Sequence, residues 1–395
     1  MLATPSQRNL TLLLEELDIP PGAYERAERR YQNLGEFFGS DHAQCARFSP
    51  HIYPQGSFRL GTVIRPLDGG EYDLDVGCRL RAGVSKSAYT QRQLKRLVGQ
   101  DLERYRTLRG IEEELDEKRR CWRLAYQDEL AFHMDVVPSI PEEAPRRRVL
   151  QERMQLNGLD AAVAARVAQH AGAITDTEDD NFDVISPEWL VSNSEGFALW
   201  FESRMRQARL LLERQAAQAG FTIDDLPAQR WNSPLQAAIR LLKRHRDHMY
   251  LSNTDSQPIS VIITTLAALA YRGETDVESA LLGVLERMEG FVQAAVPHVP
   301  NPVNPAEDFA DKWDHQDYAH LHLEYNFRGW LAQAQAHFAA LRAAGSVTQL
   351  EAALRPFAVT PGRERLVETL GSAANAPAAA VEPAGRPWGS SCRSQ

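Results

Sequence analysis

Hydrophobic residues recur at helical spacing in the first part of the chain. Leucines gather on one face of residues 9–17, and after the breaker Pro20-Pro21-Gly22 the pattern resumes from about Ala23 to Phe38. A third helical pattern extends from Lys86 to Glu117. These segments predict amphipathic helices that pack against a sheet.

Residues 72–76 have the period of a half-buried strand, with acidic residues at alternate positions. Successive side chains of a strand face opposite ways, so Leu74 is expected to face the core while Asp73 and Asp75 share the other face. Two neighbouring carboxylates repel by about 3 kcal/mol at about 5 Å in an effective dielectric of about 20. A divalent cation would neutralise them, and Mg²⁺ is typically held by carboxylates together with substrate phosphate oxygens.

A further pair of strands is predicted downstream. Residues 122–126 alternate, residues 130–138 are mostly apolar, and residues 127–129 can form the turn of a hairpin. Asp135 lies in the second of these strands, where an uncompensated carboxylate is costly. A cation shared with the two earlier aspartates would compensate for it, and three acids are what a two-metal centre requires.

Residues 54–62, just before the first acidic strand, read Pro-Gln-Gly-Ser-Phe-Arg-Leu-Gly-Thr. Two glycines and two hydroxyl side chains suit a tight turn whose backbone N–H groups point outward and can bind phosphate.

The second half of the chain is mostly helical in pattern. Ser233 and Pro234 have the residue types of an N-cap and a first helical position. The helix that they begin is expected to display the basic cluster of residues 243–246 at its end, where positive charge complements the helix dipole. Residues 371–395 are rich in Ala, Pro, Gly and Ser and predict a flexible tail.

Composition narrows the functional classes. The net charge of −9 argues against a broad nucleic-acid-binding surface, which needs clustered Lys and Arg. The four scattered cysteines indicate reduced thiols in a cytoplasmic protein, not a disulfide framework or a zinc site. No signal peptide is expected, and the longest apolar run, residues 259–271, is too short to span a bilayer.

Together these motifs resemble a known family. The Gly-Ser element, the Asp-x-Asp strand and the later strand His-Met-Asp-Val-Val-Pro follow the layout of the polymerase-β-like nucleotidyltransferases, and especially of the CD-NTases, bacterial relatives of cyclic GMP–AMP synthase. The segment Trp-Leu-Val-Ser-Asn at residues 189–193 is a further match. The resemblance covers roughly residues 50–330.

The resemblance implies an α+β fold, with a polymerase-β-like core of a mixed twisted sheet and flanking helices. It also implies a helical C-terminal lobe and an active site in the cleft between core and lobe. The expected domains are the catalytic core with an N-terminal brace helix at 1–180, the lobe at 181–370 and the tail at 371–395.

The implied site holds two Mg²⁺ ions, for which Mn²⁺ can substitute, on Asp73, Asp75 and Asp135. The resemblance also implies a set of nucleotide contacts, namely Gln55, Gly56, Ser57, Thr62, Lys243 and Ser260. A basic helix end and a serine at a helix start also have structural explanations, the helix dipole and the N-cap.

The implied activity is template-independent synthesis of a cyclic di- or trinucleotide from NTPs, ATP and/or GTP, with release of pyrophosphate. The product would be a second messenger of bacterial anti-phage (CBASS) signalling, sensed by a separate effector protein. A regulatory or ubiquitin-transfer-like protein partner stays open, although the chain ends in Arg393-Ser394-Gln395 where a small residue is usual. No membrane and no double-stranded nucleic-acid activator are expected.

Two alternatives stay open. The first is an enzyme that tails RNA or makes oligoadenylate, which the acidic balance disfavours. The second is an inactive scaffold or antitoxin of the same fold, which would have no reason to keep three mutually repelling aspartates.

Overall fold

A computed structural model describes residues 3–67, 69–127, 131–218 and 233–371. The predicted hairpin turn at 127–129 and the predicted tail lie, apart from their first residues, outside this description. The described residues form two compact units. The helical unit takes those of 1–18, 61–67 and 201–385, and the sheet unit takes those of 19–60 and 68–200. The expected division at residue 180 differs from this one, in which the units change over between Trp200 and Phe201.

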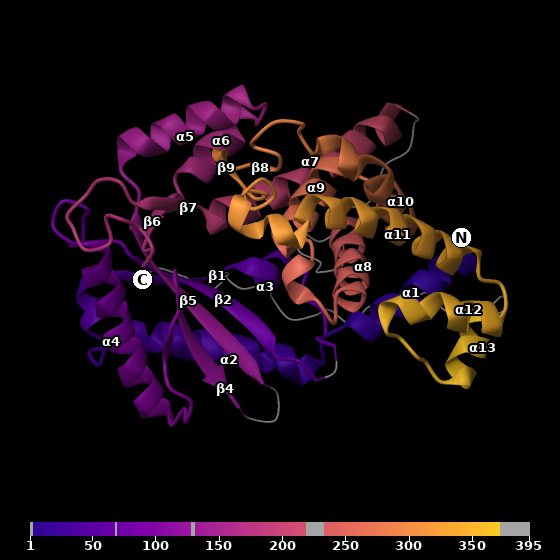
Figure 1. The fold of residues 1–395 in the computed structure, drawn as a ribbon, viewed down its shortest axis with the longest axis horizontal. Helices are drawn as coiled ribbons and strands as arrows, with labels where there is room; N and C mark the ends of the chain where they lie inside the picture. Colours follow the sequence, from indigo (N-terminus) through magenta and orange to yellow (C-terminus); the bar gives the residue numbers. More distant parts are fainter. Residues whose placement is uncertain (1–2, 68, 128–130, 219–232, 372–395) are drawn as a thin grey trace. The chain divides into compact units, whose positions relative to one another are not determined.

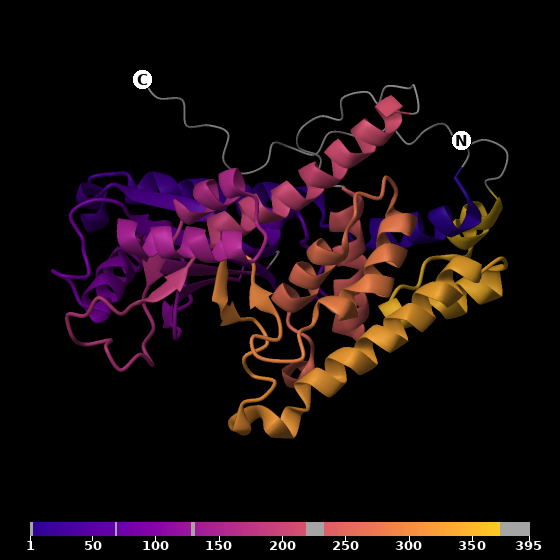
Figure 2. The same cartoon turned by 90° about the horizontal axis from the view of Figure 1, so that it is seen from above.

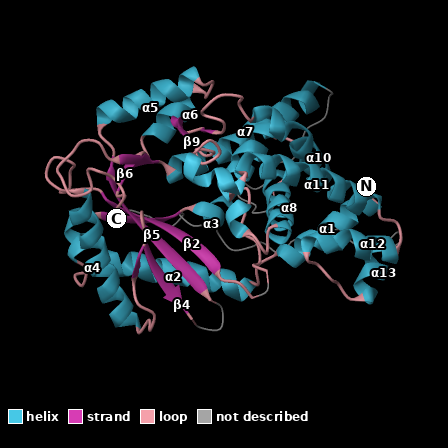
Figure 3. Ribbon diagram, viewed as in Figure 1, coloured by secondary structure: helices cyan, strands magenta, loops and turns pink. Residues whose placement is uncertain are grey.

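The sheet unit contains a seven-stranded mixed sheet (Figures 1 and 3). Its strand order is β1-β2-β5-β4-β3, with β6 and β7 continuing from β5. β2 and β5 are parallel, and the other paired strands are antiparallel. The strands are β1 (Pro50–Pro54), β2 (Tyr72–Leu80), β3 (Asp116–Glu117), β4 (Trp122–Tyr126), β5 (Phe132–Pro141), β6 (Gly172–Ile174) and β7 (Leu190–Ser192). The helices are α2 (Pro21–Phe38), η1 (Gln44–Phe48), α3 (Gly56–Leu60), α4 (Gln91–Arg109), α5 (Ala144–Leu156), α6 (Ala161–Ala168) and the first turns of α7 (Ser194–Gln218).

Helices α2 and α4 cover one face of this sheet, and Figure 1 shows α2 crossing behind β2, β5 and β4. The covered face is apolar, and Leu74 and Met134 at its centre are 0% exposed. Arg30 of α2 lies over the rings of Tyr126 and Phe132, with its guanidinium carbon 4.2 and 4.5 Å from their centroids. The predicted strand of residues 72–76 and the predicted hairpin of β4 and β5 are confirmed.

The helix expected from Lys86 to Glu117 is shorter. α4 begins after Thr90, which forms a capping box with the third residue of the helix, and it ends at Gly110 with a φ of +64°. Glu117 belongs to β3. The apolar spacing that suggested one long helix therefore spans a cap, a helix and a strand.

The helical unit contains α1 (Pro5–Leu17), the rest of α7, α8 (Pro234–Met249), η2 (Thr254–Ser256), α9 (Ser260–Ala270), α10 (Val277–Arg287), η3 (Met288–Phe291), η4 (Gln316–Leu321), α11 (Leu323–Ala343), α12 (Val347–Leu354), η5 (Arg355–Phe357), α13 (Arg363–Gly371) and a hairpin of β8 (Pro300–Asn301) and β9 (Asn304–Asp308). Figure 2 shows the long α11 leading into α12 and α13. The predicted start of α8 is confirmed, because Ser233 accepts a hydrogen bond from the N–H of Gln236 and Pro234 is the first helical residue. Over the described residues, no helix has the length and apolarity needed to cross a bilayer.

Candidate active site

The three predicted metal ligands lie on the face of the sheet opposite α2 and α4. β2 and β5 pair in parallel, and their register sets Asp75 directly beside Asp135. Asp73 lies two residues before Asp75 and therefore on the same face, beside His133. The sheet thus brings together three acids that are far apart in the sequence.

Asp135 is paired with an arginine from the next strand. Arg123 on β4 stands opposite Asp135 in the antiparallel β4–β5 pair. Its Nε and Nη2 atoms donate to Oδ1 and Oδ2 of Asp135, each over 2.7 Å. Such two-bonded contacts are among the strongest charge-assisted hydrogen bonds. The sequence analysis missed Arg123, although the alternation of residues 122–126 places it on the face opposite Leu124.

Asp73 lies among further charged groups. Nδ1 of His133 is 3.7 Å from Oδ1 of Asp73, and Nε2 of His133 is 2.5 Å from Oε2 of Glu71. The protein atoms packed around part of the Asp73 side chain raise its pKa. Arg123 opposes this shift, and the negative charge of Asp135 adds to it. A bound cation would relieve this concentration of negative charge.

The Gly-Ser element packs against Asp75. The N–H of Gln55 donates to the Asp75 carbonyl oxygen over 2.9 Å. Gly56 begins α3 with a φ of +61°, and a Cβ at this position would lie 1.9 Å from Oδ2 of Asp75. Only glycine lets the backbone approach the carboxylate this closely. The predicted tight turn is therefore the start of a short helix, which the fully buried Phe58 anchors and on which Ser57 is half-buried.

The residue types on this face fit a divalent metal centre, because carboxylate oxygens are the donors that Mg²⁺ and Mn²⁺ prefer. In the part of the chain that the structure describes, no group of three or more His, Cys, Asp or Glu side chains is already arranged to hold a metal ion. Both carboxylate oxygens of Asp135 are bonded to Arg123. The donors therefore fit by chemistry, and metal binding would require Asp135 to leave Arg123 or to share its oxygens.

The chain is similar in sequence and fold to known nucleotidyltransferases. Residues 50–138 match the family model described as the nucleotidyltransferase domain of cyclic GMP-AMP synthase DncV-like proteins. The chain is 27% identical to the c-di-GMP synthase of Roseivirga ehrenbergii over 315 residues, which cover 78% of this chain and 73% of that protein. It is 25% identical over 338 residues to the cyclic dinucleotide synthase CdnG of Bradyrhizobium diazoefficiens, with 79% and 71% covered. The structure of the Bradyrhizobium diazoefficiens CD-NTase CdnG in complex with GTP has the same fold, with a TM-score of 0.62 at 21% identity over 94% of this chain and 98% of that chain.

Residues 50–138 are thus similar to a nucleotidyltransferase domain, and the chain as a whole shares the fold of a CD-NTase. The predicted α+β fold, with its mixed sheet, flanking helices and helical C-terminal region, is thereby confirmed.

The remaining predicted nucleotide contacts belong to the helical unit. Nζ of Lys243 donates to the carbonyl oxygen of Thr62 over 2.9 Å, and both residues are buried. Ser260 is the first residue of α9, but Ile259 holds the N-cap position. Oγ of Ser260 instead accepts a hydrogen bond from Nη2 of Arg246 over 3.0 Å. The structure thus pairs Thr62 with Lys243, in a unit separate from the one that carries the three aspartates.

The basic cluster at residues 243–246 is buried, contrary to the expectation that α8 displays it. Its four side chains belong to residues that are between 1% and 7% exposed. Arg244 donates to the carbonyl oxygen of Arg65 and Arg246 to that of Pro258. These carbonyl oxygens belong to segments without regular secondary structure, so they need donors from side chains. The charge of these four residues therefore led to a wrong prediction of their exposure.

A second polar cluster continues along the same face of β2. Arg79 is buried and donates to Oε2 of Glu195 over 2.7 Å, to the hydroxyl of Tyr53 over 3.1 Å and to the carbonyl oxygen of His170 over 2.8 Å. Burial by itself would raise the pKa of Glu195, but hydrogen bonds from His170 and His51 and the charge of Arg79 hold it well below its ordinary value. This cluster ties β1, β2 and the start of α7 together.

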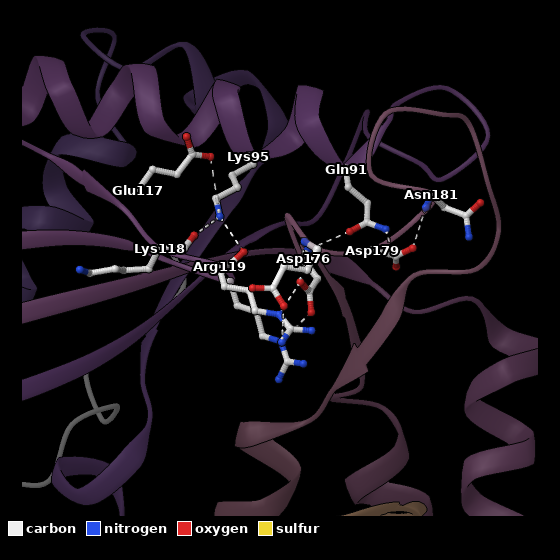
Figure 4. Close-up of polar contacts among 10 residues, drawn as sticks. Gln91, Lys95, Glu117, Lys118, Arg119, Asp176, Asp179 and Asn181 are labelled. Carbon is white, nitrogen blue, oxygen red and sulfur yellow. Dashed lines mark hydrogen bonds and ion pairs between the residues drawn. The ribbon is translucent and has the colours of Figure 1, made fainter. Parts of the chain in front are cut away.

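The turn between β3 and β4, which leads to Arg123, is anchored by Asp176 (Figure 4). Asp176 accepts hydrogen bonds from Nε of Arg119 over 2.7 Å and from Nε of Arg120 over 2.9 Å. Lys95 of α4 donates to backbone carbonyl oxygens of the same turn. The hairpin that presents Arg123 is therefore held from two sides.

Proposed function

We propose that this nucleotidyltransferase joins NTPs into a cyclic di- or trinucleotide and releases pyrophosphate. The supporting observation is the in-register pairing of Asp75 with Asp135, with Asp73 on the same face. Both relatives are named as synthases of cyclic dinucleotides, which favours a dinucleotide product. The complex of CdnG with GTP makes GTP the first substrate to test, before ATP.

In this proposal Asp73, Asp75 and Asp135 hold two Mg²⁺ or Mn²⁺ ions. Such ions, when bound, stabilise charge on the attacking and leaving oxygens of an in-line displacement. The contribution of the chain is positioning and charge. Gly56, whose backbone packs against Asp75, fixes the distance between the acids and the segment that would contact the triphosphate.

The nucleotide contacts that we propose begin with the Gly-Ser element. Gly56 and Ser57 offer backbone N–H groups and a hydroxyl to the triphosphate, next to Gln55. Lys243 contributes its ammonium group, which donates a hydrogen bond to the neutral carbonyl oxygen of Thr62. An ammonium group gains more from a phosphate oxygen than from a neutral carbonyl, because the hydrogen bond is then between two charges. Ser260 is the last of the proposed contacts.

The test incubates the purified protein with Mg²⁺ or Mn²⁺ and all four NTPs, one of them labelled in turn. A small product that resists alkaline phosphatase, identified by mass spectrometry as a cyclic oligonucleotide, is expected. Asp75→Asn should abolish this product. Asp183→Asn, the same change at an exposed ion pair with Arg92, should leave it unchanged.

Other outcomes distinguish the alternatives. In a parallel reaction with RNA added, label that enters only this RNA would instead indicate a tailing enzyme. We also propose that the product acts in anti-phage signalling through a separate effector protein. In a host that carries the complete system, Asp75→Asn should then remove protection. Unchanged protection, together with no new nucleotide in the tube, would favour a scaffold.

A further inference from the structure

We propose that Arg123 is a built-in substitute cation, which holds Asp135 while the metal site is empty and must be displaced when a divalent ion binds. This inference rests on the proposed metal site and adds to it a residue that regulates its affinity. Arg123 would act through Asp135 and is therefore a positioning residue.

The contact between Arg123 and Asp135 would compete with a metal ion for the carboxylate. Both oxygens of Asp135 accept hydrogen bonds from Arg123 at 2.7 Å, so a metal ion at either oxygen must displace a hydrogen bond or share that oxygen with a positive charge. The pair is shielded, with 29% of the Arg123 side chain and 19% of the Asp135 side chain exposed. The guanidinium group of an arginine is protonated at any pH used in practice, so Arg123 brings a full positive charge to this carboxylate.

A second effect of Arg123, the orientation of Asp135 as a ligand, acts in the opposite direction and would strengthen metal binding. A hydrogen-bond donor behind a metal ligand orients that ligand, and loss of such a donor typically weakens metal binding about 10- to 100-fold. Those donors are usually neutral or are bonded to a ligand atom that the metal does not need. Here the donor is a full positive charge on the same carboxylate, so it repels a divalent ion directly. We therefore expect repulsion and competition to outweigh orientation.

The hairpin supplies a matched control. Arg120 lies three residues before Arg123, and its Nε donates a hydrogen bond to Asp176 over 2.9 Å, not to one of the three acids. Arg120→Gln removes the same charge from the same hairpin and leaves the pair of Arg123 with Asp135 in place. It reports what loss of an arginine does to this hairpin in general.

The experiment titrates Mn²⁺ into the nucleotide-free protein and follows the EPR signal of the unbound ion. Arg123→Gln is expected to bind Mn²⁺ about ten-fold tighter than wild type, which corresponds to about 1.4 kcal/mol of binding free energy. Arg123→Lys, which keeps the charge but cannot make the two-bonded contact, is expected to lie between the two, and it serves if Arg123→Gln does not fold. Arg120→Gln should bind as wild type does. Thermal unfolding with EDTA or Mn²⁺ gives a second readout, in which the metal should raise the melting temperature of Arg123→Gln more than that of wild type.

The outcomes that contradict this inference can be distinguished from those that contradict the proposed metal site. Mn²⁺ binding by wild type with equal or weaker binding by Arg123→Gln overturns the inference and leaves the proposed metal site standing. Absence of Mn²⁺ binding in every variant overturns both. Tighter binding by Arg120→Gln as well would assign the effect to the net charge of the hairpin, which also overturns the role of Arg123.

Discussion

Replacing Gly56 by alanine tests whether the backbone of the Gly-Ser element sets the position of Asp75. Two costs can be separated. The φ of +61° lies in the left-handed region, where an alanine costs about 1 kcal/mol relative to glycine. The new Cβ would also lie 1.9 Å from Oδ2 of Asp75, a distance that no real contact sustains. The carboxylate must therefore move by about 1 Å, and a misplacement of this size in an active site costs about 100-fold in rate.

Gly110 offers a control with the same backbone cost and no neighbour. Its φ is +64°, and a Cβ there would meet nothing within 4 Å. Gly110→Ala should lower the melting temperature by about 2 °C, the effect of about 1 kcal/mol in a chain of this size, and Gly56→Ala should lower it by at least as much. Only Gly56→Ala should lose nucleotide synthesis, by about 100-fold under saturating NTP and metal.

The assay is the initial rate of nucleotide product formation, with unfolding followed by circular dichroism on the same samples. Near wild-type synthesis by Gly56→Ala would refute the reasoning, since the carboxylate would then tolerate the shift or would not matter. Equal losses of activity in both variants would show that backbone strain, not the contact with Asp75, limits the enzyme.

Two other predictions concern stability. Glu195→Gln should cost about 3 kcal/mol at pH 7, because it leaves Arg79 buried without its charged partner. The folded-state pKa of Glu195 is depressed, so this loss of stability is fully present above the ordinary value of 4.5 and shrinks as the pH falls below it. Urea unfolding at several pH values measures it. In the same assay, the control Asp183→Asn should have no measurable effect at any of these pH values. Lys243→Met should cost about 2 kcal/mol, because the buried carbonyl oxygen of Thr62 loses a charged donor, and it should also raise the KM for NTP. Loss of stability with an unchanged KM would contradict a triphosphate contact.

Local patterns in the sequence predicted much of this fold. The alternation around Leu74 fixed which face of β2 carries Asp73 and Asp75, because side-chain direction in a strand depends only on position. Ser233 and Pro234 predicted the start of α8 to the residue, because capping is a contact between near neighbours in the chain. Both features depend on interactions within a few residues.

Features that depend on distant partners were missed. Arg123 could be assigned to a strand but not to Asp135, because the register of β4 on β5 depends on the whole sheet. Lys243 could be assigned to a helix end, but its burial depends on the segment of residues 61–67, which crosses to the helical unit directly after α3. Sequence spacing carries little information about which carbonyl oxygens lack a backbone donor.

Strand register is the quantity on which this candidate site depends most. A slip of one residue between β2 and β5 would turn Asp75 toward the apolar face and remove it from Asp135. Several contacts oppose such a slip. Asp75 fits against Gly56, and Gly77, two residues along, has no room for a Cβ because the ring of Tyr53 would be 2.1 Å away. These residues need not touch a nucleotide to affect catalysis, because they hold the pairing that brings the acids together. Substitutions that loosen the register should therefore reduce synthesis before they unfold the sheet.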